Sequence, residues 1–105
     1  EHAPVTVFIF NPDGVHPWLL RPIDQMFREV VDIQSIGAAI QNMLLAAQDL
    51  GLGSLWICDV FSAYEELRTW LGEESQMIAA VSFGYPNEQP AARPRKPIDE
   101  VTRWM

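Results

Sequence analysis

The pattern of apolar and polar positions predicts a strand near each end of the chain, with helices between the two strands. Residues 5–10 (VTVFIF) are β-branched and aromatic and precede the turn sequence NPDG, which is typical of a buried strand. Residues 77–83 form a second continuous apolar run, long enough for a strand covered on both faces, and Gly84 ends it. The order strand, helix, helix, strand indicates a layered α/β or α+β arrangement.

The strongest helical pattern covers residues 32–50, and a short helix is predicted before it over residues 23–31. Asp32 is predicted to cap the N-terminus of the longer helix. Apolar residues recur there at steps of three and four, and the remaining faces are rich in Gly and Ala, which is typical of a central helix. Gly51 is predicted to end the helix at the C′ position, and residues 55–58 to follow as an extended segment.

A further helix is predicted to begin at Ser62, because Ser62 and Glu65 have the spacing of a capping box. Leu67, Trp70 and Leu71 are predicted to form its buried stripe. Residues 15–22, which contain two prolines, are predicted to be irregular. Four prolines between positions 86 and 97 favour an extended arm, and residues 98–105 are predicted to be a final strand or part of that arm.

Composition and charge narrow the function classes. A chain of 105 residues is one domain at most, and its net charge of -7 argues against nucleic acid and anionic membrane surfaces as partners. No run of about 20 uninterrupted apolar residues is found, so no membrane span is expected. The single cysteine, Cys58, excludes an internal disulfide and fits a cytoplasmic location. His2 and His16 lack paired ligands, so no metal is expected.

Three ordered motifs resemble the FMN-dependent nitroreductase family. They are Ala3-Pro4 before an apolar strand, the helix end and turn LLAAQDLGLG at residues 44–53, and FGYP at residues 83–86 followed by a basic, Pro-rich tail. The similarity covers nearly the whole chain but only the C-terminal half or so of a typical member. The resemblance therefore implies one partial domain over residues 1–105, with an α+β, nitroreductase-like sheet and a central helix, truncated at the N-terminus.

The resemblance implies an enzyme: a homodimeric, FMN-dependent oxidoreductase that takes hydride from NADH or NADPH and reduces a nitroaromatic, quinone or similar acceptor. In this family, backbone N–H groups after the glycine-containing turn meet the flavin ring, and the matching positions are Trp56, Ile57, Cys58 and Asp59. Such contacts do not depend on the identity of the side chain. No catalytic side chain is expected. The alternative interpretation is that Trp56 and Ile57 are core residues and Cys58 is a small apolar one.

A second cofactor-binding element is implied in the tail. Arg93 and Arg95, before Pro97 and an acidic pair, match the family pattern that binds the FMN phosphate, and clustered basic residues suit a phosphate chemically. Lys96 adjoins this group. The alternative is a solvated basic loop.

Two elements of the family are not found in the sequence: the arginine-containing N-terminal segment and the segment with serine and asparagine beside the flavin. The chain is therefore expected to be a truncated piece, or a short homologue that rebuilds its core by dimerising. A non-catalytic dimerisation or interaction module that keeps the family core without flavin is the alternative function.

Overall fold

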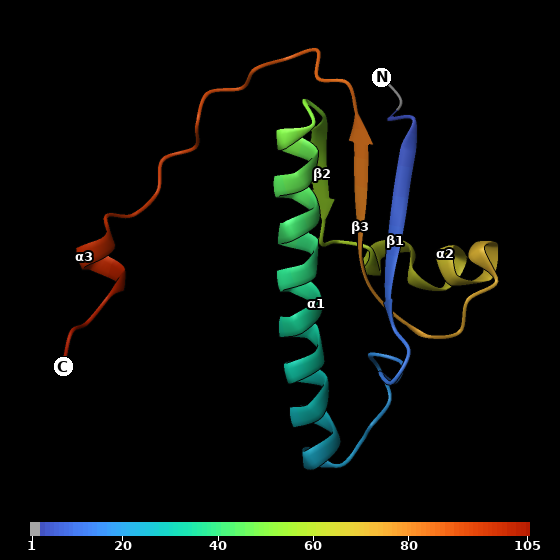
Figure 1. Cartoon of the computed structure of the whole chain (residues 1–105). Coiled ribbons are helices and arrows are strands. Elements are labelled where there is room, and N and C mark those ends of the chain that lie inside the picture. The colour runs from blue at the N-terminus through green and yellow to red at the C-terminus, as the bar shows by residue number, and fades with distance from the viewer. Residues whose placement is uncertain (1–2) are drawn as a thin grey trace.

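The computed structural model describes residues 3–105 of the chain. The fold consists of a three-stranded sheet, one long helix, two short helices and a projecting tail (Figure 1). In chain order the elements are β1 (Val5–Asn11), α1 (Ile23–Asp49), β2 (Gly53–Ile57), the 3-10 turn η1 (Phe61–Ala63), α2 (Tyr64–Leu71), β3 (Gln76–Gly84) and α3 (Ile98–Val101).

The sheet has the order β1-β3-β2, and β3 pairs antiparallel with both neighbours. Ala80 lies opposite Phe8 on one side and Ile57 on the other. A register shift between Ile9 and Phe10 interrupts the β1 ladder. Because β3 is central and its faces are packed on both sides, its sequence is a continuous apolar run and not an alternating one, as predicted.

Each face of the sheet carries its own apolar cluster. On one face, α1 packs Ile40 against Ala79 and Val81 of β3. On the other face, Val60 and Tyr64, from the segment that contains η1 and α2, pack with Met77 and Ala80. The Tyr64 hydroxyl also accepts a hydrogen bond of 3.0 Å from the backbone N–H of Met77. The arrangement is an α+β fold in which the sheet lies between the long helix and the shorter elements.

The helical region contains one helix, and the prediction of two helices separated at Asp32 was wrong. No Gly or Pro separates residues 23–31 from residues 32–50, and the apolar spacing continues through the junction. A single interior Asp costs only a few tenths of a kcal/mol relative to good helix formers, so Asp32 does not end the first segment. The helix begins after Pro22 instead, where the missing proline N–H costs nothing because first-turn donors have no intrahelical partner.

The predicted end of α1 is confirmed. Gly51 has φ of 73°, a left-handed conformation that glycine adopts without steric cost. Its N–H donates to Gln48 O at 3.1 Å, and the N–H of Leu52 donates to Ala47 O at 2.8 Å. These two bonds form a Schellman motif, which turns the chain directly from α1 into β2.

Two other local predictions were wrong, and for residues 98–105 one of the two alternatives, the strand, was wrong. Ser62 lies inside η1 and does not cap α2; its hydroxyl donates to Asp59 Oδ1 at 3.0 Å. Trp70 was predicted to be buried but is 74% exposed. The buried face of the two-turn helix α2 is formed by Tyr64 and Leu67. Trp70 lies edge-to-face against the side chain of Phe8 on β1, with ring centroids 6.1 Å apart. Residues 98–101 form the helical turn α3 in place of a strand.

The extended arm is confirmed. After Gly84 the chain has no regular secondary structure until Ile98. Figure 1 shows this tail crossing the end of the sheet and then running away from it to α3. Side chains along it are exposed, including Trp104 and Met105.

Much of the surface of α1 is apolar and exposed. Among the described helices, α1 alone is long and apolar enough to cross a membrane; its most apolar stretch has a mean hydropathy of 1.3, and 11% of that stretch is buried. A soluble core helix meets the same criteria, and Ile40 and Ala47 of α1 are buried. The expectation that nothing spans a membrane relied on a stricter criterion, an uninterrupted apolar run, and stays a prediction.

Candidate functional site

The candidate flavin segment begins at the end of β2. Trp56 and Ile57 lie opposite Val81 and Ala80, where the ladder with β3 ends. Their side chains point to opposite faces of the sheet and join the two apolar clusters. Both side chains are therefore part of the core, and only the backbone of these two residues is left for the cofactor role that the sequence predicts.

The Trp56 ring lies next to Gly37 of α1. A Cβ added at Gly37 would lie 3.7 Å from the Cη2 atom of the Trp56 indole, which is an ordinary van der Waals distance. The helix and the ring are therefore in contact here, and the contact does not itself require a glycine. The indole Nε1 is buried and has no hydrogen-bond partner within the described chain.

Cys58 and Asp59 lie beyond the ladder and are exposed. The N–H of Val60 donates to Cys58 O at 3.0 Å. Together with the hydrogen bond from Ser62 to Asp59, this bond closes a tight turn between β2 and η1. The turn therefore places two exposed residues, Cys58 and Asp59, directly after the end of β2.

Arg93 and Arg95 lie on the exposed arm, between β3 and α3. Figure 1 shows that the arm leaves the sheet at the end of β3, and β2 runs antiparallel to β3, so Cys58 lies toward the opposite end. Within one chain the structure does not bring the two arginines to the 56–59 segment. Their role in binding phosphate stays a prediction.

A buried polar network that sequence reasoning missed joins the segment after β1 to α1 and β3. Glu29, only 3% exposed, lies 2.7 Å from the Arg21 guanidinium and accepts hydrogen bonds of 3.4 Å from Val15 N–H and the Gln76 amide. Gln76 in turn accepts a bond of 3.3 Å from Asn11. One signal was present in the sequence: Glu29 falls on the same helical face as Ile36 and Ile40.

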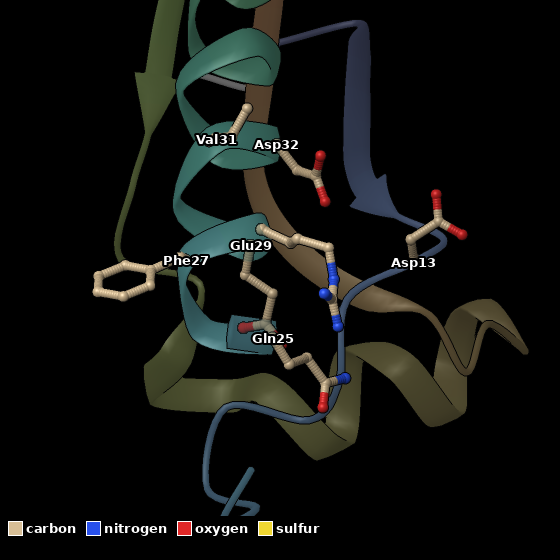
Figure 2. Close-up of a pocket in the computed structure, with 7 residues that line it drawn as sticks. Asp13, Gln25, Phe27, Glu29, Val31 and Asp32 are labelled. Atoms are coloured by element: carbon tan, nitrogen blue, oxygen red, sulfur yellow. The ribbon is translucent and has the colours of Figure 1, made fainter. Parts of the chain in front are cut away.

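Two surface hollows accompany these elements. One of about 600 Å³ lies against the first turns of α1 and includes Asp13, Glu29 and Asp32 in its lining. Figure 2 shows Asp32 extending from α1 toward the segment that carries Asp13, with Phe27 on the other side of the helix. The second, of about 760 Å³, is lined by residues 53–55 of β2 and residues 82–86 at the end of β3, among others. No predicted cofactor-binding residue lines either hollow.

Metal ligation is not indicated within the described part of the chain. Residues 3–105 contain no group of three or more His, Cys, Asp or Glu side chains placed to hold an ion. His2 lies outside the described residues. His16 contacts Glu65 instead.

The contact between His16 and Glu65 joins the irregular segment 15–22 to α2. His16 Nε2 shares a hydrogen bond with Glu65 Oε1, and Arg68 Nη1 lies 3.3 Å from the other carboxylate oxygen. The bond with His16 is the main reason that the pKa of Glu65 lies below its ordinary value of 4.5.

Glu65→Gln is expected to make the free energy of unfolding fall less steeply as the pH is lowered. A carboxyl group whose pKa is lower in the folded state stabilises the fold above its unfolded pKa, and this contribution is lost as the pH falls through the folded pKa. Urea unfolding between about pH 3 and pH 6 should therefore show a steeper decline for the wild type than for Glu65→Gln. Glu66→Gln, at the exposed neighbouring position, should follow the wild type; parallel curves for all three proteins would contradict the assignment.

Comparison with known proteins places this fold in a family. Residues 1–85 match the model of the nitroreductase family. The chain is 32% identical over 79 residues to an NADPH-flavin oxidoreductase of Vibrio harveyi, covering 71% of this chain and 33% of that protein. It is 40% identical over 62 residues to a protein assigned as an NADH dehydrogenase/NAD(P)H nitroreductase in Archaeoglobus fulgidus, covering 54% of this chain and 35% of that protein.

A solved structure also matches the chain and belongs to the same family. A protein assigned as a nitroreductase from Desulfovibrio desulfuricans, in complex with FMN, superposes with a TM-score of 0.64 at 36% identity, over 70% of this chain and 44% of that one. The chain belongs to the nitroreductase family, and the predicted nitroreductase-like α+β fold is confirmed. It spans about a third of the length of the curated relatives it matches.

Proposed function

We propose that the chain acts in an FMN-dependent oxidoreductase of nitroreductase type, with NADH or NADPH as hydride donor and a nitroaromatic, quinone or similar compound as acceptor. The observation that carries the proposal is the likeness, at 36% identity, to a nitroreductase in complex with FMN. The relative from Vibrio harveyi is named an NADPH-flavin oxidoreductase, which supports the donor class. A cytoplasmic location is part of the proposal, supported by the single free thiol of Cys58.

Two separate parts of the chain would bind the ring and the phosphate of FMN. The exposed peptide groups of Cys58 and Asp59, just past the β2 ladder, fit the edge of a flat ring that needs N–H donors. Arg93 and Arg95 would hold the phosphate, because a guanidinium meets phosphate oxygens with two parallel hydrogen bonds. When bound, FMN supplies the hydride chemistry, and the protein binds and orients it.

A homodimer is part of the same proposal. Val30, Ile33 and Leu45 are exposed on α1, and Ile98 and Val101 are exposed on α3 at the end of the arm. Apolar patches of this extent mark association surfaces in soluble proteins. The arginines and the 56–59 segment do not meet within one chain. In a dimer, the arginines of one copy could complete the cofactor site of the other.

Titration of the chain with FMN tests the proposed function. We expect saturable quenching of flavin fluorescence and a rise in melting temperature with excess FMN, because a ligand that binds only the folded state stabilises it. A colourless protein that shows neither effect contradicts FMN binding by this chain. Riboflavin, which lacks the phosphate, is the matched control ligand and should bind more weakly.

The second candidate function is a non-catalytic dimerisation module, favoured by the exposed apolar surface of α1. Sedimentation equilibrium distinguishes the two candidates when it is combined with the flavin titration. A dimer of the 11.9 kDa chain that binds no FMN supports the module. A monomer that binds no FMN contradicts both candidates.

A further inference from the structure

Two aromatic side chains from distant parts of the sequence form an exposed surface next to the candidate flavin segment. Trp18, in the irregular stretch after β1, lies edge-to-face against Phe61, the first residue of η1, with ring centroids 6.4 Å apart. Tyr64 lies beneath both, stacked with Phe61 at 5.7 Å and edge-on to Trp18 at 5.3 Å. Tyr64 is 2% exposed, whereas Trp18 is 62% exposed and Phe61 46% exposed.

The segment that carries Trp18 is held in place by polar contacts of Arg21. Arg21 donates to Pro17 O at 3.3 Å and to Leu19 O at 2.9 Å, on either side of Trp18. The same guanidinium is paired with the buried carboxylate of Glu29. His16 adds a ring contact of 5.0 Å to Trp18. These contacts restrain the backbone on both sides of Trp18, while more than half of the surface of this residue faces solvent.

Phe61 is tied to the candidate flavin segment by the turn that precedes it. The bond from Val60 N–H to Cys58 O and the bond from Ser62 to Asp59 Oδ1 both cross this turn. Asp59 and Phe61 are therefore neighbours in space as well as in sequence. The Phe61 ring therefore belongs to the same turn as Cys58 and Asp59, the exposed residues assigned to the flavin ring.

We propose that Trp18 and Phe61 form a contact surface for the ring of the electron acceptor and thereby help to select aromatic acceptors. The inference rests on the proposed function. Offset or edge-to-face contacts between rings add about 0.5–1.5 kcal/mol to the area that they bury, and an electron-poor nitroaromatic or quinone ring is attracted to the electron-rich face of an indole. Core packing alone does not account for Trp18, because Tyr64 already closes the cluster below it.

Binding of 2-methyl-1,4-naphthoquinone tests the proposal, measured by calorimetry with and without saturating FMN. Trp18→Ala is expected to weaken quinone binding by roughly 2- to 12-fold, as one ring contact is worth about 0.5–1.5 kcal/mol. Trp18→Phe should retain most of the affinity because it keeps a ring. Phe61→Ala should weaken binding to a similar extent. Trp70→Ala is the matched control, since Trp70 is also exposed but lies near the end of α2.

The outcomes separate this inference from the proposed function. Unchanged quinone affinity in Trp18→Ala and Phe61→Ala, with circular dichroism unchanged, overturns the aromatic surface even if FMN binds. Equal losses in Trp70→Ala also overturn it, because they indicate non-specific adsorption to exposed indoles. Failure of the wild type to bind FMN counts against the proposed function, whereas ring-dependent quinone binding in the same protein still supports the surface.

Discussion

Glu29→Ala is expected to lower the free energy of unfolding by about 3–5 kcal/mol, because it leaves the Arg21 charge without its partner inside the protein. The side chains of Arg21 and Glu29 are 19% and 4% exposed, so water does not readily replace the lost carboxylate. The substitution also removes the acceptor of the Val15 N–H and Gln76 amide bonds. Urea unfolding followed by circular dichroism measures the change.

The exposed pair formed by Asp24 and Arg28 on the same helix is the matched control. Its charges are 2.9 Å apart, and its side chains are 65% and 69% exposed. Asp24→Ala should therefore cost less than about 1 kcal/mol. The double variant Arg21→Leu, Glu29→Leu should recover much of the loss, since replacing a buried pair with apolar residues is often close to neutral. If Glu29→Ala costs no more than Asp24→Ala, the buried pair does not hold the segment after β1.

Local steric rules predicted the strands and the end of α1 well. Gly51 was placed correctly because a left-handed residue after a helix nearly requires glycine. The strand at residues 77–83 was found because an almost continuous apolar run of that length, ended by Gly84, is typical of a strand packed on both faces. In both cases the structure is determined by interactions among a few neighbouring residues, and these can be read from the sequence alone.

Predictions that depended on tertiary contacts failed. The Ser62 hydroxyl has two available partners, the backbone of α2 and the Asp59 carboxylate, and the turn after β2 favours the carboxylate. The Asp32 cap failed because the face formed by Glu29, Ile36 and Ile40 packs as one surface across the expected break. A sequence pattern gives the candidate partners of a polar side chain but not which of them the fold brings within reach.

The candidate site was predictable only in part for the same reason. Resemblance to the family pointed to residues 56–59 and to Arg93 and Arg95, and the exposed turn at Cys58 and Asp59 is compatible with the first group. Nothing in the spacing of the residues indicated that Trp18 would lie against Phe61, since the two rings meet through tertiary packing around Tyr64.

Arg95→Ala is expected to weaken FMN binding by roughly 10- to 100-fold, the range of a lost charge-assisted hydrogen bond. The prediction follows from the proposed role of Arg95 at the phosphate. Arg95 lies on the exposed arm, so its substitution should leave the free energy of unfolding of the cofactor-free chain unchanged. Fluorescence titration with FMN gives the dissociation constant, and urea unfolding gives the stability.

Two controls isolate the phosphate. Riboflavin has the same ring without the phosphate, so the affinity of Arg95→Ala for riboflavin should equal that of the wild type. Arg103→Ala removes an equally exposed charge farther along the same tail and should leave FMN affinity nearly unchanged. An equal loss in Arg103→Ala would mean that FMN responds only to the overall charge of this acidic chain. A loss of riboflavin affinity in Arg95→Ala would place the arginine at the ring and not at the phosphate.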